Sequence, residues 1–325
     1  MRDLIDGIFI NAFEHDRTAP LEDQARFDVA TLATHGDRLA MTTDSYVVDP
    51  LFFPGGNIGK LAVCGTVNDL AVGGALPQYL SCGMIIEEGL SLDTLREVAD
   101  AMQAAAADAG VRIVTGDTKV VHRGAADKLF INTAGVGVIP AGVNIATTRV
   151  QPGDKILCNG YIGDHGAAIV DARGELAIEN TIASDCQSLC GLISAMLACC
   201  PDIHAMRDAT RGGLASVANE FALDSQTGIR LDETAIPVRP EVRGMCEILG
   251  LDPLYLANEG KVVAAVPAAH ADAVLARMRA HPAGTDSAII GEVSETPAGR
   301  VILQTAFGGE RVVDLLIGEQ LPRIC

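Results

Sequence analysis

Tryptophan is absent from the 325-residue sequence, and aromatic residues make up only 4% of it. The core must therefore be built mainly from Ala, Val, Ile and Leu, which favours the thin layers of an α/β fold. The sequence also lacks an apolar run of about 18 residues, so no membrane span is expected. The first 13 residues contain Asp3 and Asp6 and do not resemble a signal peptide.

Positive charge is scarce, because 24 Lys and Arg face 42 Asp and Glu, which gives a net charge of −18. This charge repels a phosphate backbone and an anionic membrane surface, so neither nucleic acid nor membrane is expected as a partner. The nine cysteines include no CxxC pair. Without a secretory signal they indicate free, mostly buried thiols, and we expect a cytoplasmic protein.

The chain length predicts about two domains. We place an N-terminal domain at residues 1–148, a C-terminal α/β domain at 149–317 and a mobile tail at 318–325. Hydrophobic periodicity predicts mixed strands and helices in both domains. The segment 39–48 is rich in β-forming residues and is expected to form a strand that ends at Asp44. Further strands are expected at 79–86, 111–121, 128–139, 154–159, 261–266, 287–293 and 300–304. The helices are expected at 58–73, 91–109, 185–200, 211–221 and 268–281, with a glycine-rich turn at 160–166.

One glycine-rich segment, Gly55 to Leu61, resembles a phosphate-binding P-loop but departs from its pattern. Only three residues separate Gly55 from Gly59-Lys60, and Leu61 supplies no hydroxyl for a metal ion. We interpret it as a turn before a helix. If the protein uses ATP, it does so without a P-loop.

Acidic residues recur where strands or helices end beside small residues. They are Asp44, Asp69 (after Asn68) and Asp117. Each alone would more often cap a turn than bind a ligand. Three such carboxylates are a donor set that suits Mg²⁺, a hard cation that takes oxygen ligands and bridges phosphates.

Three further features carry possible chemistry. The run from Asp208 to Gly213 ends in two glycines and could present backbone N–H groups to an anion, although a plain helix cap is the commoner reading. Glu259, before an apolar strand, could act as a base or as a solvated turn residue. His165 lies in the glycine-rich turn and is a functional candidate, whereas most other histidines are expected at the surface or at caps.

The last residue, Cys325, is a nucleophilic thiol at the chain end, where a plain frayed terminus is the alternative reading. The tail from Gly318 to Cys325 spans at most ~26 Å when extended. Pro322 disfavours a helix there. A tail of this length could carry the thiol into a cleft between the domains.

Taken together, these motifs resemble the HypE family of hydrogenase maturation proteins, the carbamoyl dehydratases, over essentially the whole chain. The C-terminal Pro-Arg-Ile-Cys is specific to that family. The others are shared more loosely with aminoimidazole ribonucleotide synthetase, selenophosphate synthetase and thiamine-phosphate kinase. The matching segments are 44–61, 64–71, 115–121, 207–213, 257–261 and 322–325.

The resemblance implies a two-domain PurM-like fold of α+β type, whose N-terminal domain forms a dimeric β-barrel with a second copy. It implies ATP and Mg²⁺ as cofactors, with Asp44, Asp69 and Asp117 as metal ligands. Cys325 would carry the substrate, Glu259 would remove protons, and Lys119 would stabilise charge on oxygen or phosphate. The implied cofactor-binding residues are Asp44, Gly65, Thr66, Asn68, Asp69, Thr115, Gly116, Asp117, Thr118 and Asp208. Relatives usually begin with a short glycine-rich stretch that encloses the ATP phosphates, and the sequence starts past it, so weak ATP binding or exposed phosphates are expected.

The implied activity is the ATP-dependent dehydration of a carbamoyl group on Cys325 to a thiocyanate. A carbamoyltransferase, HypF, would load the group, and the HypC–HypD complex would receive the cyanide for a nickel–iron hydrogenase. One alternative is a superfamily synthetase or kinase that acts on a free small molecule and does not need Cys325. Another is a scaffold without catalytic activity, which would not need the three aspartates.

Overall fold

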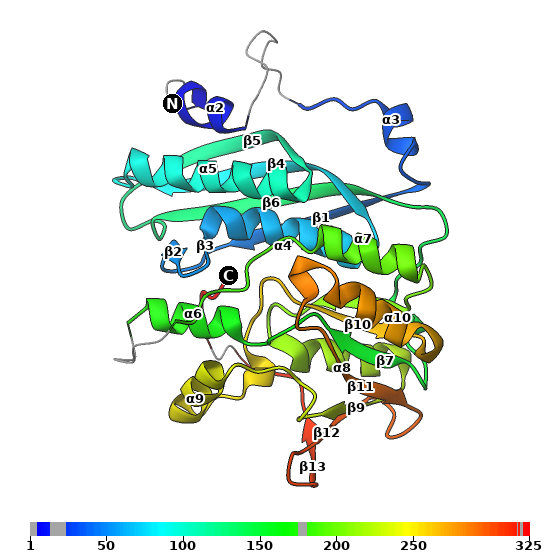
Figure 1. The fold of residues 1–325 in the computed structure, drawn as a ribbon. Coiled ribbons are helices and arrows are strands. Elements are labelled where there is room, and N and C mark those ends of the chain that lie inside the picture. The colour runs from blue at the N-terminus through cyan, green and yellow to red at the C-terminus, as the bar shows by residue number, and fades with distance from the viewer. Residues whose placement is uncertain (1–4, 14–23, 175–180, 317, 319–320) are drawn as a thin grey trace.

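The chain forms two units, one above the other in Figure 1, and its C-terminus lies between them. The computed structural model describes residues 5–13, 24–174, 181–316, 318 and 321–325. The N-terminal start of the sequence, residues 1–4, therefore lies outside the described residues. The last strand of the first unit ends at Ile139 and the first strand of the second begins at Lys155, on either side of the predicted boundary.

The first unit is a four-stranded sheet in the order β1-β6-β4-β5, with α4 and α5 on one face (Figure 1). β6 lies antiparallel to both β1 and β4, and β4 is parallel to β5. The strands are β1 (Arg38–Tyr46), β4 (Leu76–Glu87), β5 (Arg112–Val121) and β6 (Leu129–Ile139), with a small hairpin of β2 (Phe52–Phe53) and β3 (Gly56–Asn57). The helices are η1 (Ile5–Phe9), α2 (Ile10–Ala12), α3 (Val29–Ala33), α4 (Ile58–Val72) and α5 (Leu92–Ala109).

Local signals decide where the two long helices begin and end. The Ser91 side chain accepts a hydrogen bond from the Asp93 N–H at the start of α5, and Gly110 ends it with φ +70°. Asn57 caps α4 by accepting the Lys60 N–H at 3.0 Å. The glycine-rich segment before α4 is therefore a turn and a helix cap, as predicted.

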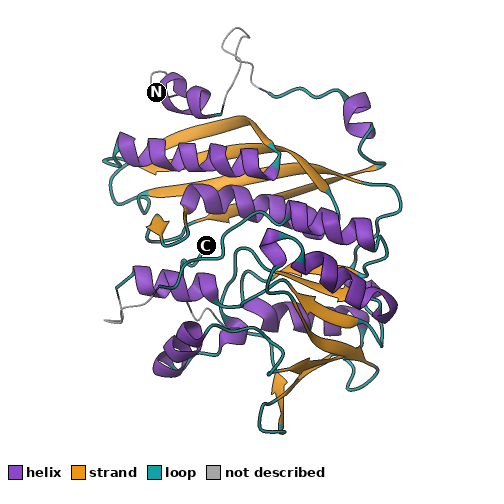
Figure 2. Cartoon of the chain, viewed as in Figure 1, coloured by secondary structure: helices purple, strands orange, loops and turns teal. Residues whose placement is uncertain are grey.

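The second unit is a seven-stranded mixed sheet in the order β13-β12-β9-β11-β7-β10-β8. Figure 2 shows helices on its faces and along the boundary with the first unit. The strands are β7 (Lys155–Cys158), β8 (Ala205–Asp208), β9 (Gly228–Asp232), β10 (Val262–Val266), β11 (Ala288–Ser294), β12 (Arg300–Gln304) and β13 (Glu310–Val313). The helices are η2 (Thr147–Arg149), α6 (Asp164–Ala172), α7 (Cys190–Cys199), α8 (Gly213–Ser225), α9 (Pro240–Leu249), η3 (Pro253–Tyr255), α10 (Ala268–Arg279) and η4 (Pro282–Gly284).

Strand β10 of this sheet is buried on both faces, and its side chains alternate between two cores. On β10, Val262 and Ala264 pack with α7 and α10, whereas Val263 and Ala265 pack with α8. A strand that is covered on both sides reads as a continuous apolar run, which is why β10 was easy to predict.

Two predicted elements end at other residues than expected. The strand expected to end at Asp44 continues to Tyr46, because the Tyr46 ring is buried and its hydroxyl lies 3.2 Å from the Thr66 hydroxyl. The glycine-rich turn expected at 160–166 ends at Gly163, because α6 begins at Asp164 and its first turn is buried.

In the second half, the helix predicted from Asp185 begins only at Cys190. The preceding segment is held by hydrogen bonds, because Asp185 accepts backbone N–H groups and Asn68 binds both Gln187 and Leu189. The elements of this half that were not predicted are β8, β9, β13, α6, α9 and the short helices η2, η3 and η4. Within the described ranges, no helix combines the length and the apolar character needed to cross a membrane.

Candidate functional site

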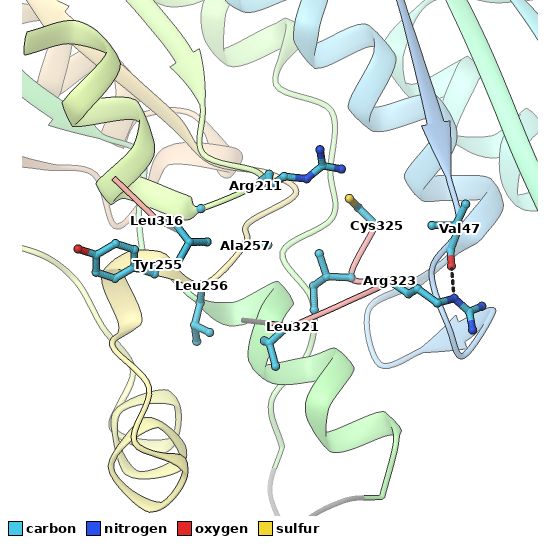
Figure 3. Close-up of a pocket in the computed structure, with 11 residues that line it drawn as sticks. Val47, Arg211, Tyr255, Leu256, Ala257, Leu316, Leu321, Arg323 and Cys325 are labelled. Atoms are coloured by element: carbon cyan, nitrogen blue, oxygen red, sulfur yellow. Dashed lines mark hydrogen bonds between the residues drawn. The ribbon is translucent and has the colours of Figure 1, made fainter. Parts of the chain in front are cut away.

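A cavity of about 160 Å³ lies between the two units, where the chain ends (Figure 3). Its walls come from the end of β1, from the turn between β8 and α8, from the η3–β10 connection and from the tail. The lining residues are Val47, Arg211, Gly212, Tyr255, Leu256, Ala257, Leu316, Leu321, Arg323, Ile324 and Cys325.

The described end of the tail, residues 321–325, is docked beside the segment that follows β1. The Val47 N–H donates to the Cys325 carbonyl at 3.0 Å, and the Asp49 N–H donates to the Arg323 carbonyl at 3.4 Å. The Ile324 side chain is 8% exposed and belongs to the core of the first unit. The tail that the sequence predicted to be mobile is thus bound to the body of the protein.

The Arg323 side chain fixes the tail to the first unit as well. Its Nε donates to the Val47 carbonyl at 3.2 Å, and its guanidinium pairs with Asp127 and lies 3.9 Å from Asp49. This arginine therefore makes both backbone and charge contacts within two residues of the reactive end.

The thiol of Cys325 points to the guanidinium of Arg211 inside the cavity (Figure 3). Burial, together with the charges of Glu259 and Asp44, raises the pKa of Cys325 to about 12, although the charge of Arg211 and a hydrogen bond from it act in the opposite direction. A thiol is nucleophilic as its anion. The docked thiol is therefore a poor nucleophile at neutral pH. The docked position is better suited to a sulfur that already carries its group.

Glu259 is 3% exposed, and its Oε1 has no hydrogen-bond partner among the described residues. Its backbone is fixed by Asp185, which accepts the Glu259 N–H at 2.9 Å and forms a buried ion pair with Lys261, also at 2.9 Å. Burial, followed by the charges of Asp185 and Asp208, raises the pKa of Glu259 well above its usual range. Once ionised, this carboxylate is a stronger base than an ordinary glutamate.

Asp44, Asp69 and Asp208 crowd together near Glu259. The Thr42 hydroxyl donates to Asp69 at 3.0 Å, but burial and the Asp44 charge still raise the Asp69 pKa. The pKa of Asp208 is raised to about 7, by burial first and then by Asp69. Such mutual repulsion is what a nearby positive charge would relieve.

Three other predicted cofactor residues lie inside the fold. A Cβ on Gly65 would lie 2.3 Å from the Tyr46 hydroxyl, so this glycine allows the close contact of α4 with β1. Thr66 is fully buried, with its hydroxyl 2.5 Å from that of Thr133. Asn68 binds the segment before α7 through both ends of its amide. The side chains of Thr66 and Asn68 are therefore engaged within the protein.

The predicted residues of β5 lie away from this cluster. β1 and β5 are the two outer strands of the sheet, three strand spacings apart, or about 14 Å. Asp117 is exposed there and pairs with Lys119 at 2.9 Å, and Thr115, Gly116 and Thr118 lie on the same strand. Across the described part of the chain, no three His, Cys, Asp or Glu side chains form a group that could hold a metal ion.

Sequence reasoning missed several residues of this site. Arg211 lies within the predicted anion-binding run, but nothing in the run indicated that it would meet the thiol. Arg173 donates to the Pro322 and Arg323 carbonyls at 2.7 and 2.8 Å. His165 was a functional candidate, and its Nε2 lies 2.7 Å from the Ile324 carbonyl. Bonds to backbone carbonyls leave no motif in a sequence.

The chain matches two family models, the N-terminal domain of AIR synthase related proteins at residues 22–139 and the C-terminal domain at residues 151–304. The carbamoyl dehydratase HypE of Rhodobacter capsulatus is 57% identical over 325 residues, which cover 100% of this chain and 95% of that protein.

Two solved structures are also similar. The hydrogenase maturation protein HypE in complex with ATP is 49% identical, with a TM-score of 0.94 over 100% of this chain and 96% of that one. A chain of a HypE–HypF complex is 44% identical, with a TM-score of 0.83 over 96% and 99% of the two chains.

Titration of Asp208 is expected to lower stability as pH rises. The unfolded carboxyl loses its proton from its ordinary pKa of 3.8, whereas the folded one keeps it up to about 7. The free energy of unfolding should fall by up to about 1.4 kcal/mol per pH unit in this window. Urea unfolding between pH 4 and 7 should show a shallower slope for Asp208→Asn than for wild type, while exposed Asp100→Asn keeps the wild-type slope. Identical slopes for all three proteins would contradict the assignment.

Proposed function

The chain belongs to the HypE family of carbamoyl dehydratases, and on this basis we propose that it uses ATP to dehydrate a carbamoyl group carried on its own Cys325. The product is a thiocyanate, which supplies the cyanide ligand during maturation of a nickel–iron hydrogenase. The observation that carries the proposal is the docked tail, which places the Cys325 sulfur in a cavity beside Arg211 and close to Glu259.

The chemistry needs a leaving group, because an amide oxygen does not leave as oxide. Phosphorylation of the carbonyl oxygen by ATP lets it leave as phosphate, while the carbon–nitrogen bond becomes triple and nitrogen loses two protons. The similar HypE structure in complex with ATP supports ATP as the phosphoryl donor. The site must also exclude water, or the activated group would hydrolyse.

Residues of this chain take three roles. Glu259, whose Oε1 has no partner among the described residues, removes protons from nitrogen once it is ionised. Arg211, which contacts the sulfur, stabilises negative charge on the carbonyl oxygen or the phosphate. The N-terminus of α8, just after Arg211, offers backbone N–H groups to the same anion.

Magnesium would neutralise the phosphates beside Asp44 and Asp69, whose charges repel each other in the protein alone. Asp117 and Lys119 can join this site only from a second copy. Pairing of β5 of one protomer with β1 of the other would bring the partner subunit's Asp117 toward Asp44. The two strands are the free edges of the sheet among the described residues.

The face of that sheet opposite α4 supports a homodimer. Leu39, Met41 and Ile85 are exposed on it, and they alternate with residues that face the helices. A second copy buries these side chains and closes both sheets into one barrel. HypF is the proposed donor of the carbamoyl group, as the similar HypE–HypF complex supports, and a HypC–HypD complex is the proposed acceptor of cyanide.

Mass spectrometry of the C-terminal peptide tests the proposed function. After incubation with HypF, carbamoyl phosphate and ATP, we expect a carbamoyl adduct on Cys325 that then loses the mass of one water. Cys325→Ser should give no thiocyanate, since it has no sulfur to carry the group. Product formed by that variant on a free small molecule would instead support a superfamily synthetase or kinase.

Replacement of Glu259 by Gln should slow thiocyanate formation on the loaded protein by about 10²-fold or more, because the base is lost. The dissociation constant for ATP, measured separately, should change little. Exposed Glu295→Gln is the matched control and should keep the wild-type rate. A normal rate for Glu259→Gln would remove this residue from the mechanism, and the same test applies to Lys119→Ala.

Replacement of Met41 by Asp should yield monomers in light scattering, because it places a charge on the apolar face that the second copy covers. Ile248→Asp, at an exposed apolar position on α9, should leave the protein dimeric. A wild-type protein that is monomeric, or a Met41→Asp variant that remains dimeric, would contradict the proposed barrel.

A further inference from the structure

Four consecutive carbonyls at the end of the chain accept hydrogen bonds from the body of the protein. Arg173 binds those of Pro322 and Arg323, His165 binds that of Ile324, and the Val47 N–H binds that of Cys325. These bonds are made to the backbone and hold it residue by residue. They therefore fix how far the tail enters the cavity.

The tautomer of His165 follows from its partners. A carbonyl only accepts, so Nε2 must carry the proton that it donates to Ile324. Nδ1 then accepts from the Ser184 hydroxyl at 2.8 Å, and that oxygen accepts the Cys186 N–H at 3.1 Å. The ring is fully buried and lies edge-on to Phe53, with the ring centres 5.5 Å apart. Its donor is thus held at one position.

Arg173 joins the tail to the other unit. Its Nε donates to the Asp49 carbonyl at 3.0 Å while its Nη2 binds the tail carbonyls. His165 lies in the first turn of α6 and Arg173 directly follows its last residue. One rigid helix therefore carries both tail-binding groups, about 12 Å apart along its axis.

We propose that His165 and Arg173 form a latch on the tail. When closed, the latch sets how deeply Cys325 enters the cavity for dehydration. It opens to expose the thiol while the carbamoyl group is being transferred to it. The proposal rests on the proposed function, since only a protein that loads and then dehydrates its tail needs both states. The docked thiol supports two states, because it is buried and has a pKa of about 12, whereas a carbamoyl donor needs an accessible nucleophile. His165 and Arg173 are positioning residues, because they touch the tail backbone and not the reacting atoms.

The latch predicts opposite effects on the two steps together with an unchanged KM for ATP, a combination that loss of fold would not produce. In Arg173→Met, alkylation of Cys325 by iodoacetamide should become roughly tenfold faster or more, since two bonds from a charged group are lost. Dehydration of the loaded thiol at saturating ATP should slow by a similar factor, while KM for ATP stays the same. Arg173→Lys should give intermediate values, and exposed Arg243→Met, on the neighbouring α9, should match wild type.

His165 has its own matched pair. Gln can place an N–H near the position of Nε2 and should largely keep the wild-type rates, whereas His165→Leu should resemble Arg173→Met. Loading with potassium cyanate, which carbamoylates thiols directly, separates dehydration from the action of HypF in every variant.

Two results distinguish failure of the latch from failure of the function. If cyanate-loaded wild-type protein with ATP never loses water, the proposed function fails and the latch with it. If wild type dehydrates but Arg173→Met and His165→Leu alkylate and dehydrate at wild-type rates, only the latch is overturned. A parallel fall of both rates would also overturn it.

Discussion

The position of one sulfur atom depends on hydrogen bonds to the backbone that carries it. Residues 322–325 have all four of their carbonyls bound by groups from both structural units. The second unit contributes α6, with His165 at one end and Arg173 at the other, and the first unit contributes the segment after β1. The relative position of the two units therefore determines where Cys325 lies, which makes the whole fold part of the site.

The charged groups around the cavity favour a neutral Cys325 thiol, and the proposed reaction brings further charges to it. Burial and neighbouring carboxylates raise the pKa values of the Cys325 thiol and of Glu259, which favours the neutral form of both groups. A buried acidic cluster without cations would be costly, and Arg211 is the cation beside the thiol. A cation that enters with the ATP phosphates would compensate these carboxylates, so binding of ATP and organisation of the cluster are expected to be coupled.

Local signals in the sequence were enough for much of the fold, but not for contacts between distant segments. Helix α5 was predicted from its Ser91 cap and its final Gly110, because both act within a few residues. Asp117 was expected near Asp44, yet strand order places them on opposite edges of one sheet, and no sequence pattern states that order. The contact of His165 with the Ile324 carbonyl joins residues 159 positions apart. The residues next to either of them in the sequence do not indicate it. The family motifs indicated Cys325 and Glu259 as candidate site residues, whereas the groups that contact their segments required coordinates.

Docking of the tail is the central claim, and hydrogen exchange at two amides tests it most directly. The N–H groups of Val47 and Asp49 donate to tail carbonyls, so exchange in peptides covering residues 46–50 should be slow in the full chain. It should become faster in a chain that ends at residue 320, while the Val111 amide at the end of α5 stays protected in both. Equal exchange of the 46–50 amides in the two chains would contradict the docked tail.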